Sequence, residues 1–85
     1  MAVRVEFYSS LRAAAGRDAV ELEAGTVADA VRQLEGDFRE NADFLKLLAV
    51  SNAILNGENV TFLSGPRTKL RNGDKLVFFP PLGGG

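Results

Sequence analysis

The chain of 85 residues contains no cysteine and no histidine. These absences exclude thiolate nucleophiles, disulfides, zinc sites built on Cys or His, and catalytic triads with an imidazole base. Carboxylates, serine or lysine could still support catalysis, but no loop spacing typical of a carboxylate metal site is present. The G-x-x-x-x-G-K-[ST] motif for nucleotide phosphates is also missing. We therefore expect no metal and no bound cofactor, with any ATP bound by a partner.

An excess of one charge and long apolar runs are missing as well. Lysine and arginine total 10 and aspartate and glutamate total 11, a formal net charge of −1. Such a balance gives no electrostatic footprint for nucleic acid or anionic lipid. No stretch reaches the roughly 18 apolar residues of a membrane span, and the first seven residues alternate apolar and charged side chains, unlike a signal peptide. We expect a cytoplasmic protein that binds neither nucleic acid nor membrane.

Hydrophobic periodicity predicts about five strands and one main helix. The helix begins at the capping-box residue Thr26 and ends at Gly36, and a short helical turn over 11–15 is capped by Ser9 or Ser10 and closed by Gly16. Residues 38–48 are ambiguous and are interpreted as a short second helix with Phe38, Ala42 and Leu45 on one side. Strands are predicted at 3–8, 20–23, 49–55, 60–62 and 75–79, with turns at Asn56–Gly57, Gly65–Pro66 and Asn72–Gly73–Asp74.

This order of elements predicts a small two-layer α+β fold. The main helix would pack on one face of a mixed sheet, with the first and last strands side by side at its centre. That arrangement is the β-grasp, or ubiquitin-like, fold. We expect residues 1–82 to form this one domain and residues 83–85 to form a flexible C-terminal glycine tail.

Alternation along the strands predicts an apolar patch on the face without the helix. If Leu76 and Phe78 point toward the helix, then Val77 and Phe79 point away from it. Tyr8 and Ile54 fall on the same outer face by the same counting. Scattered exposed apolar residues are common, but four on neighbouring strands favour a partner-binding surface.

The last residues combine a stiff segment with one that has no side chains. Pro80 and Pro81 hold the chain extended and lift it off the sheet. Leu82 follows, and Gly83, Gly84 and Gly85 then offer a backbone that fits a narrow channel. A frayed terminus has a similar composition, but the proline spacer directly after a strand favours a functional end.

Residues 70–85 closely resemble the C-terminus of the MoaD-type small subunits of molybdopterin synthase, which end in F-F-P-P and a final Gly-Gly. Residues 3–12 and 52–58 also resemble that family, so only the stretch near 37–49 matches loosely. At Gly83 the family usually carries another small residue.

The resemblance implies that the reactive group is the main-chain carboxylate of Gly85. An E1-like adenylyltransferase would convert it to an acyl-adenylate with ATP, and a persulfide sulfur donor would turn it into a thiocarboxylate. The large subunit of molybdopterin synthase would then receive the sulfur. Gly84 would be the lead-in to the reactive residue, and no side chain would be catalytic. The partner-binding residues implied are Tyr8, Ile54, Val77, Phe79, Pro80, Pro81, Leu82 and Gly83.

Three other functions fit the same residues. Small archaeal ubiquitin-like modifiers share the fold and the Gly-Gly ending, and their activated C-terminus forms an isopeptide bond with a lysine. Other sulfur carriers of this fold supply thiamin, cysteine or tRNA thiolation. An inert β-grasp adaptor is the third alternative.

Overall fold

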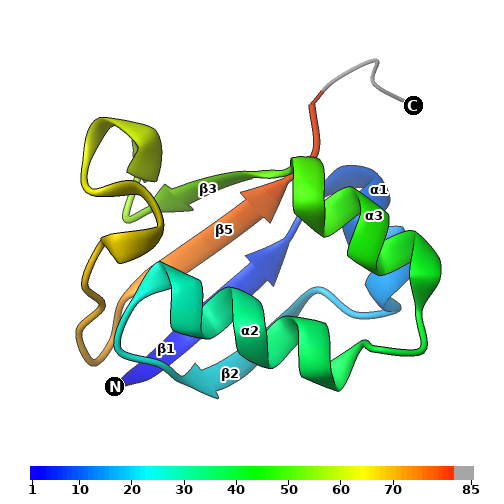
Figure 1. The fold of residues 1–85 in the computed structure, drawn as a ribbon, viewed down its shortest axis with the longest axis horizontal. Helices are drawn as coiled ribbons and strands as arrows, with labels where there is room; N and C mark the ends of the chain where they lie inside the picture. Colours follow the sequence, from blue (N-terminus) through cyan, green and yellow to red (C-terminus); the bar gives the residue numbers. More distant parts are fainter. Residues whose placement is uncertain (82–85) are drawn as a thin grey trace.

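The structure is a computed structural model that describes residues 1–81, and it places helix α2 across one face of a five-stranded sheet (Figure 1). The strands are β1 (Ala2–Phe7), β2 (Ala19–Glu23), β3 (Asn52–Leu55), β4 (Glu58–Asn59) and β5 (Lys75–Phe79). The helices are α1 (Ser9–Ala15), α2 (Val27–Asp37) and α3 (Ala42–Val50), with short 3-10 helices at Val60–Phe62 and Gly65–Arg67. The predicted ubiquitin-like α+β class is confirmed.

The sheet has the strand order β2-β1-β5-β3-β4. Strands β1 and β5 run parallel at its centre, and the other neighbouring strands are antiparallel. The N-terminal and C-terminal strands therefore lie side by side, as predicted. The turn between β3 and β4 is formed by Asn56 and Gly57, whose φ angles of 50° and 91° suit a two-residue hairpin.

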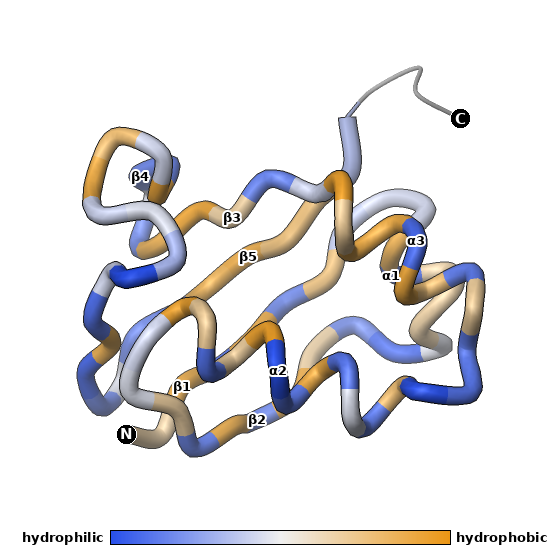
Figure 2. Tube along the Cα trace, viewed as in Figure 1, coloured by the Kyte–Doolittle hydropathy of each residue, from blue (hydrophilic) through white to orange (hydrophobic). Residues whose placement is uncertain are grey.

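The core lies between the sheet and α2. Alternate residues of β1 and β5, such as Val5 and Leu76, are fully buried, while residues between them face outward. On α2 the buried side chains are Val27, Ala30 and Leu34, which recur at helical spacing. Figure 2 shows the same pattern, with apolar and polar residues alternating along α2 and a mostly apolar β5.

The segment between α2 and β3 differs from the prediction. Helix α2 continues through Gly36, and Phe38 follows it as the C-cap rather than beginning the next helix. Helix α3 starts at Ala42 and buries Phe44 and Leu48, not Ala42, which is exposed. The reason is an aromatic cluster in which Phe44 stacks on Phe38 at 3.9 Å and meets Phe7 edge-on at 5.3 Å between ring centroids.

The start of one strand, the strand at 60–62 and one helix cap were also predicted wrongly. Ala49 and Val50 belong to α3, so β3 begins only at Asn52. Residues 60–62 form a 3-10 helix because the Asn59 side chain accepts a hydrogen bond from the backbone N–H of Thr61 at 2.8 Å. Helix α1 starts at Ser9 after the N-cap Tyr8, with no side-chain cap from either serine.

Thr26 is the predicted N-cap of α2, and its hydroxyl accepts a hydrogen bond from the N–H of Asp29 at 3.1 Å. We expect Thr26→Ala to lower the free energy of unfolding by about 1 kcal/mol, since a helix N–H loses its partner. Urea denaturation followed by circular dichroism measures this. Thr61→Ala is the control, because Thr61 is exposed and caps nothing. An equal loss in both variants would contradict the capping role.

Candidate partner-binding face

The face of the sheet without α2 carries a shallow groove of about 400 Å³ beside the end of β5. Its apolar floor comes from neighbouring strands: Ile54 of β3 lies opposite Val77 of β5, and Phe79 lies two residues further along β5. Tyr8 joins them just after β1, where its backbone N–H donates to the carbonyl of Phe78 at 3.1 Å. We call this the sheet groove; its lining residues are Tyr8, Ser9, Ile54, Gly57, Lys75, Val77, Phe79 and Pro80.

The structure thus brings together the four residues predicted to form an outer apolar patch. Val77, Phe79 and Ile54 are half-buried and the side of Tyr8 is open, with 49% of its surface exposed. These side chains are apolar, lie on three neighbouring segments and have no helix over them. A contiguous apolar surface of this kind is typical of a site that binds another protein.

The two prolines lie differently from each other. Pro80 is buried and forms part of the sheet groove, whereas Pro81 is exposed. The prediction that both prolines lift the chain off the sheet is therefore wrong for Pro80. Pro80 has no N–H to donate to the sheet, but its buried ring still forms part of the groove. Leu82, Gly83, Gly84 and Gly85 lie outside the described residues, so the predictions on them stay predictions.

Charged side chains on the outer surface of β1 and β5 border the apolar floor. Nε of Arg4 donates to Glu6 at 2.8 Å. This hydrogen bond lowers the pKa of the Glu6 carboxyl and raises the pKa of the Arg4 guanidinium. Both groups therefore stay ionised at neutral pH and neutralise each other.

Three lining residues were missed from the sequence. Lys75 stands two residues before Val77, so the alternation that placed Val77 outward also places Lys75 there. Gly57 lines the groove because the β3–β4 turn lies beside it. Ser9 has a φ of 58°, an unusual backbone conformation for serine that no sequence pattern indicated.

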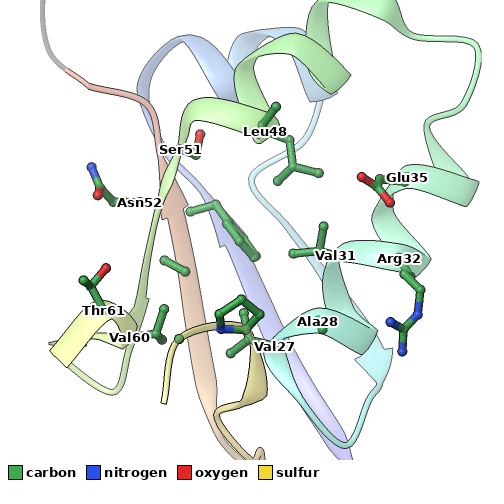
Figure 3. Close-up of a pocket in the computed structure, with 15 residues that line it drawn as sticks. Val27, Ala28, Val31, Arg32, Glu35, Leu48, Ser51, Asn52, Val60 and Thr61 are labelled. Carbon is green, nitrogen blue, oxygen red and sulfur yellow. The ribbon is translucent and has the colours of Figure 1, made fainter. Parts of the chain in front are cut away.

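A second groove, of about 450 Å³, lies on the opposite side between α2, α3, β3 and the two 3-10 helices (Figure 3). The walls are mostly apolar side chains such as Val31, Leu48 and Val60, and Arg32 and Glu35 lie on the α2 side. Of the described residues predicted to bind partners, none lines this groove.

Within residues 1–81, no group of three or more His, Cys, Asp or Glu side chains is arranged to hold a metal ion. The same part of the chain has no helix with the length and apolar character needed to cross a bilayer.

Two solved structures of similar size share the whole fold. Small archaeal modifier protein 1 of Methanosarcina acetivorans has a TM-score of 0.82 at 26% identity, covering 99% of this chain and 96% of that one. A chain of the BexX/CysO complex of Amycolatopsis orientalis has a TM-score of 0.77 at 26% identity, covering 98% and 99%. The chain is therefore a ubiquitin-like β-grasp protein with an apolar groove beside its C-terminal strand.

Sequence comparison gives the family. Small archaeal modifier protein 3 of Haloferax volcanii is 29% identical over 92 residues, covering 100% of both chains. The model of the ThiS family matches residues 5–85. The chain belongs to the ThiS family, a family of ubiquitin-like sulfur carriers and modifiers. Small carriers of this kind are generally not catalysts.

Proposed function

We propose that this protein is a carrier whose Gly85 carboxylate is activated by a partner enzyme and then transfers sulfur. The observation that carries the proposal is the sheet groove, an apolar docking surface that continues directly into Pro80 and Pro81. A partner that covers the groove would hold the start of the C-terminal segment in a defined place, because Pro80 is part of the groove itself. Positioning of this kind is what a reaction at a chain terminus requires.

The proposed chemistry takes place at the main chain. A carboxylate is a poor electrophile, so an E1-like adenylyltransferase first joins it to AMP from ATP and releases pyrophosphate. The terminal sulfur of a persulfide then attacks the acyl carbon, and AMP leaves. A thiol breaks the remaining S–S bond and is itself oxidised to a disulfide, which leaves a thiocarboxylate on Gly85. These steps use ATP and persulfide from the cytoplasm, where we place the protein.

For the acceptor, we propose the large subunit of molybdopterin synthase. The support is the resemblance of residues 70–85 to the MoaD-type ending, above all the run Phe78-Phe79-Pro80-Pro81. In this role the protein is the non-catalytic small subunit that delivers sulfur twice to build a dithiolene. The sheet groove would dock first on the activating enzyme and afterwards on the large subunit.

A second function is favoured by a different observation. The relative that is 29% identical over its full length is a small archaeal modifier protein. If this chain acts in the same way, the activated Gly85 carboxyl forms an isopeptide bond with a lysine of a target protein. The first step, adenylation by an E1-like enzyme, is common to both functions.

Intact-protein mass spectrometry of material purified from the native cells separates the two functions. We expect an oxygen-to-sulfur exchange confined to the last residue, which is the signature of a carrier. Gly85 joined to lysine side chains of other proteins, found by peptide sequencing, would instead establish the modifier. Finding neither product in cells that are making molybdopterin would overturn the carrier proposal.

A further inference from the structure

Lys75 is the only charged residue among the described residues that line the sheet groove. The others are apolar, aromatic, glycine or serine. Its side chain is exposed at the start of β5, next to Ile54 and Val77, which form the groove floor. A partner that docks on an apolar surface with a cation at its edge needs a negatively charged group at the matching position.

Two carboxylates near Lys75, those of Glu6 and Asp74, already accept hydrogen bonds from other groups. Glu6 is paired with Arg4 at 2.8 Å. Both oxygens of Asp74 accept hydrogen bonds: Oδ1 from the Asn56 side-chain amide at 3.0 Å, and Oδ2 from the backbone N–H of Arg71 at 2.8 Å. None of the ion pairs within residues 1–81 includes Lys75. The hydrogen bond from Arg4 is the main cause that lowers the pKa of the Glu6 carboxyl, and the charge of Lys75 also contributes, although the two groups are not within ion-pair distance. The Lys75 ammonium can therefore still pair directly with a carboxylate of a partner.

Two further hydrogen bonds fix the backbone that carries Lys75. The Asn56 side-chain oxygen accepts from the backbone N–H of Lys75 at 3.0 Å, and the N–H of Asn56 donates to the Lys75 carbonyl at 3.0 Å. The β3–β4 turn is thus tied to the first residue of β5. The backbone at Lys75 is therefore fixed before a partner binds, so that only the lysine side chain has to be ordered.

The charged residues of β1 and β2 have partners or neighbours of opposite charge. Glu23 of β2 accepts a hydrogen bond from the N-terminal ammonium at 3.1 Å, and Glu21 lies opposite Arg4, which is bonded to Glu6. None of these residues lines the sheet groove, whereas Lys75 does. A partner on the groove therefore meets the charge of Lys75 first, and a like charge placed there would be repelled.

We infer that the activating enzyme recognises Lys75 through a carboxylate on its own surface, beside an apolar projection that fills the sheet groove. This inference rests on the proposed function. Lys75 stands four residues before Phe79 on one strand, so its Cα lies roughly 13 Å from that of Phe79, where β5 ends. The ion pair and the apolar contact together set the direction in which the C-terminal segment enters the enzyme.

The test is ATP–pyrophosphate exchange by the E1-like adenylyltransferase of the same genome, with this protein as the variable substrate. We expect Lys75→Glu to raise KM about tenfold with little change in kcat, since the rim charge acts on association. Lys75→Gln should raise KM by a smaller factor and make it less sensitive to added salt. Lys46→Glu on α3 is the matched control, with the same charge change away from the groove.

A KM of Lys75→Glu within about twofold of the wild type would overturn the inference, since the reversal would place two carboxylates against each other and like-charge contacts cost more than that. An equal rise in Lys75→Glu and Lys46→Glu would also overturn it, because net charge rather than one contact would then be responsible. Either result leaves the proposed function intact if exchange still depends on the sheet groove. Retained circular dichroism shows that each variant is folded.

Discussion

Removal of Gly85 is expected to abolish activation of the protein completely. If the Gly85 carboxylate is the group that is adenylated, deletion moves the reacting carboxyl back by one residue, roughly 3.5 Å along the chain. A displacement of only 1 Å can reduce a positioned reaction by about two orders of magnitude. ATP–pyrophosphate exchange should fall below detection, and neither a thiocarboxylate nor an isopeptide product should form in cells.

The shortened protein provides its own control. Residues 1–81 contain the fold and the described part of the sheet groove, so thermal unfolding should be unchanged. The shortened protein should also inhibit activation of the full-length chain competitively, with an inhibition constant near the KM of the full-length protein. Exchange at a rate close to that of the full-length chain would show that Gly85 is not the reactive residue.

The fold was largely predictable because apolar and charged residues alternate strictly along β1, and burial along β5 follows the same period of two. In β1 and β5 each inward residue is apolar and pairs with a buried neighbour, as Val5 does with Leu76. A slip of one residue in β1 would expose its inward side chains and bury Arg4 and Glu6, so the register of this strand is strongly determined. Thr26 likewise identified the start of α2 through local hydrogen bonding.

The segment from Phe38 to Phe62 could not be predicted in the same way. Residues 44–50 are almost all apolar, and such a run has no period that separates helix from strand. The buried face of α3 is decided by Phe44, which packs against phenylalanines of β1 and of the α2 C-cap. At 60–62 the side chains favour a strand. The Asn59 side chain, however, accepts a hydrogen bond from the backbone N–H of Thr61, which favours a 3-10 helix instead.

The apolar residues of the sheet groove were predicted from periodicity, while the role of Lys75 beside them was not. Tyr8, Ile54, Val77 and Phe79 were placed on one face by counting in twos, and they line the groove together. Alternation also places Lys75 on this face, but a lysine at the start of a strand is usually only a solvated surface residue. Only the structure shows that Lys75 lines the groove and forms none of the ion pairs within residues 1–81.

Phe79→Asp is expected to prevent docking while the domain stays folded. Phe79 is half-buried on the outer face of β5 and lines the sheet groove, so a carboxylate here replaces an aromatic contact with a charge that must be desolvated. Loss of a central aromatic anchor costs about 3 kcal/mol, equal to roughly 100-fold in affinity. We expect kcat/KM for activation to fall by about that factor, with circular dichroism unchanged.

Two phenylalanines give matched controls for this substitution. Phe62 is 81% exposed and lies outside the sheet groove, so Phe62→Asp should leave activation and folding as they are. Phe78, the neighbour of Phe79, is 3% exposed in the core, and Phe78→Asp should unfold the domain because it buries an unpaired charge. Wild-type activation by a folded Phe79→Asp protein would show that the sheet groove is not the docking surface, whatever the role of Gly85. The two substitutions therefore distinguish the role of Phe78, which packs in the core, from the role of Phe79, which contacts a partner.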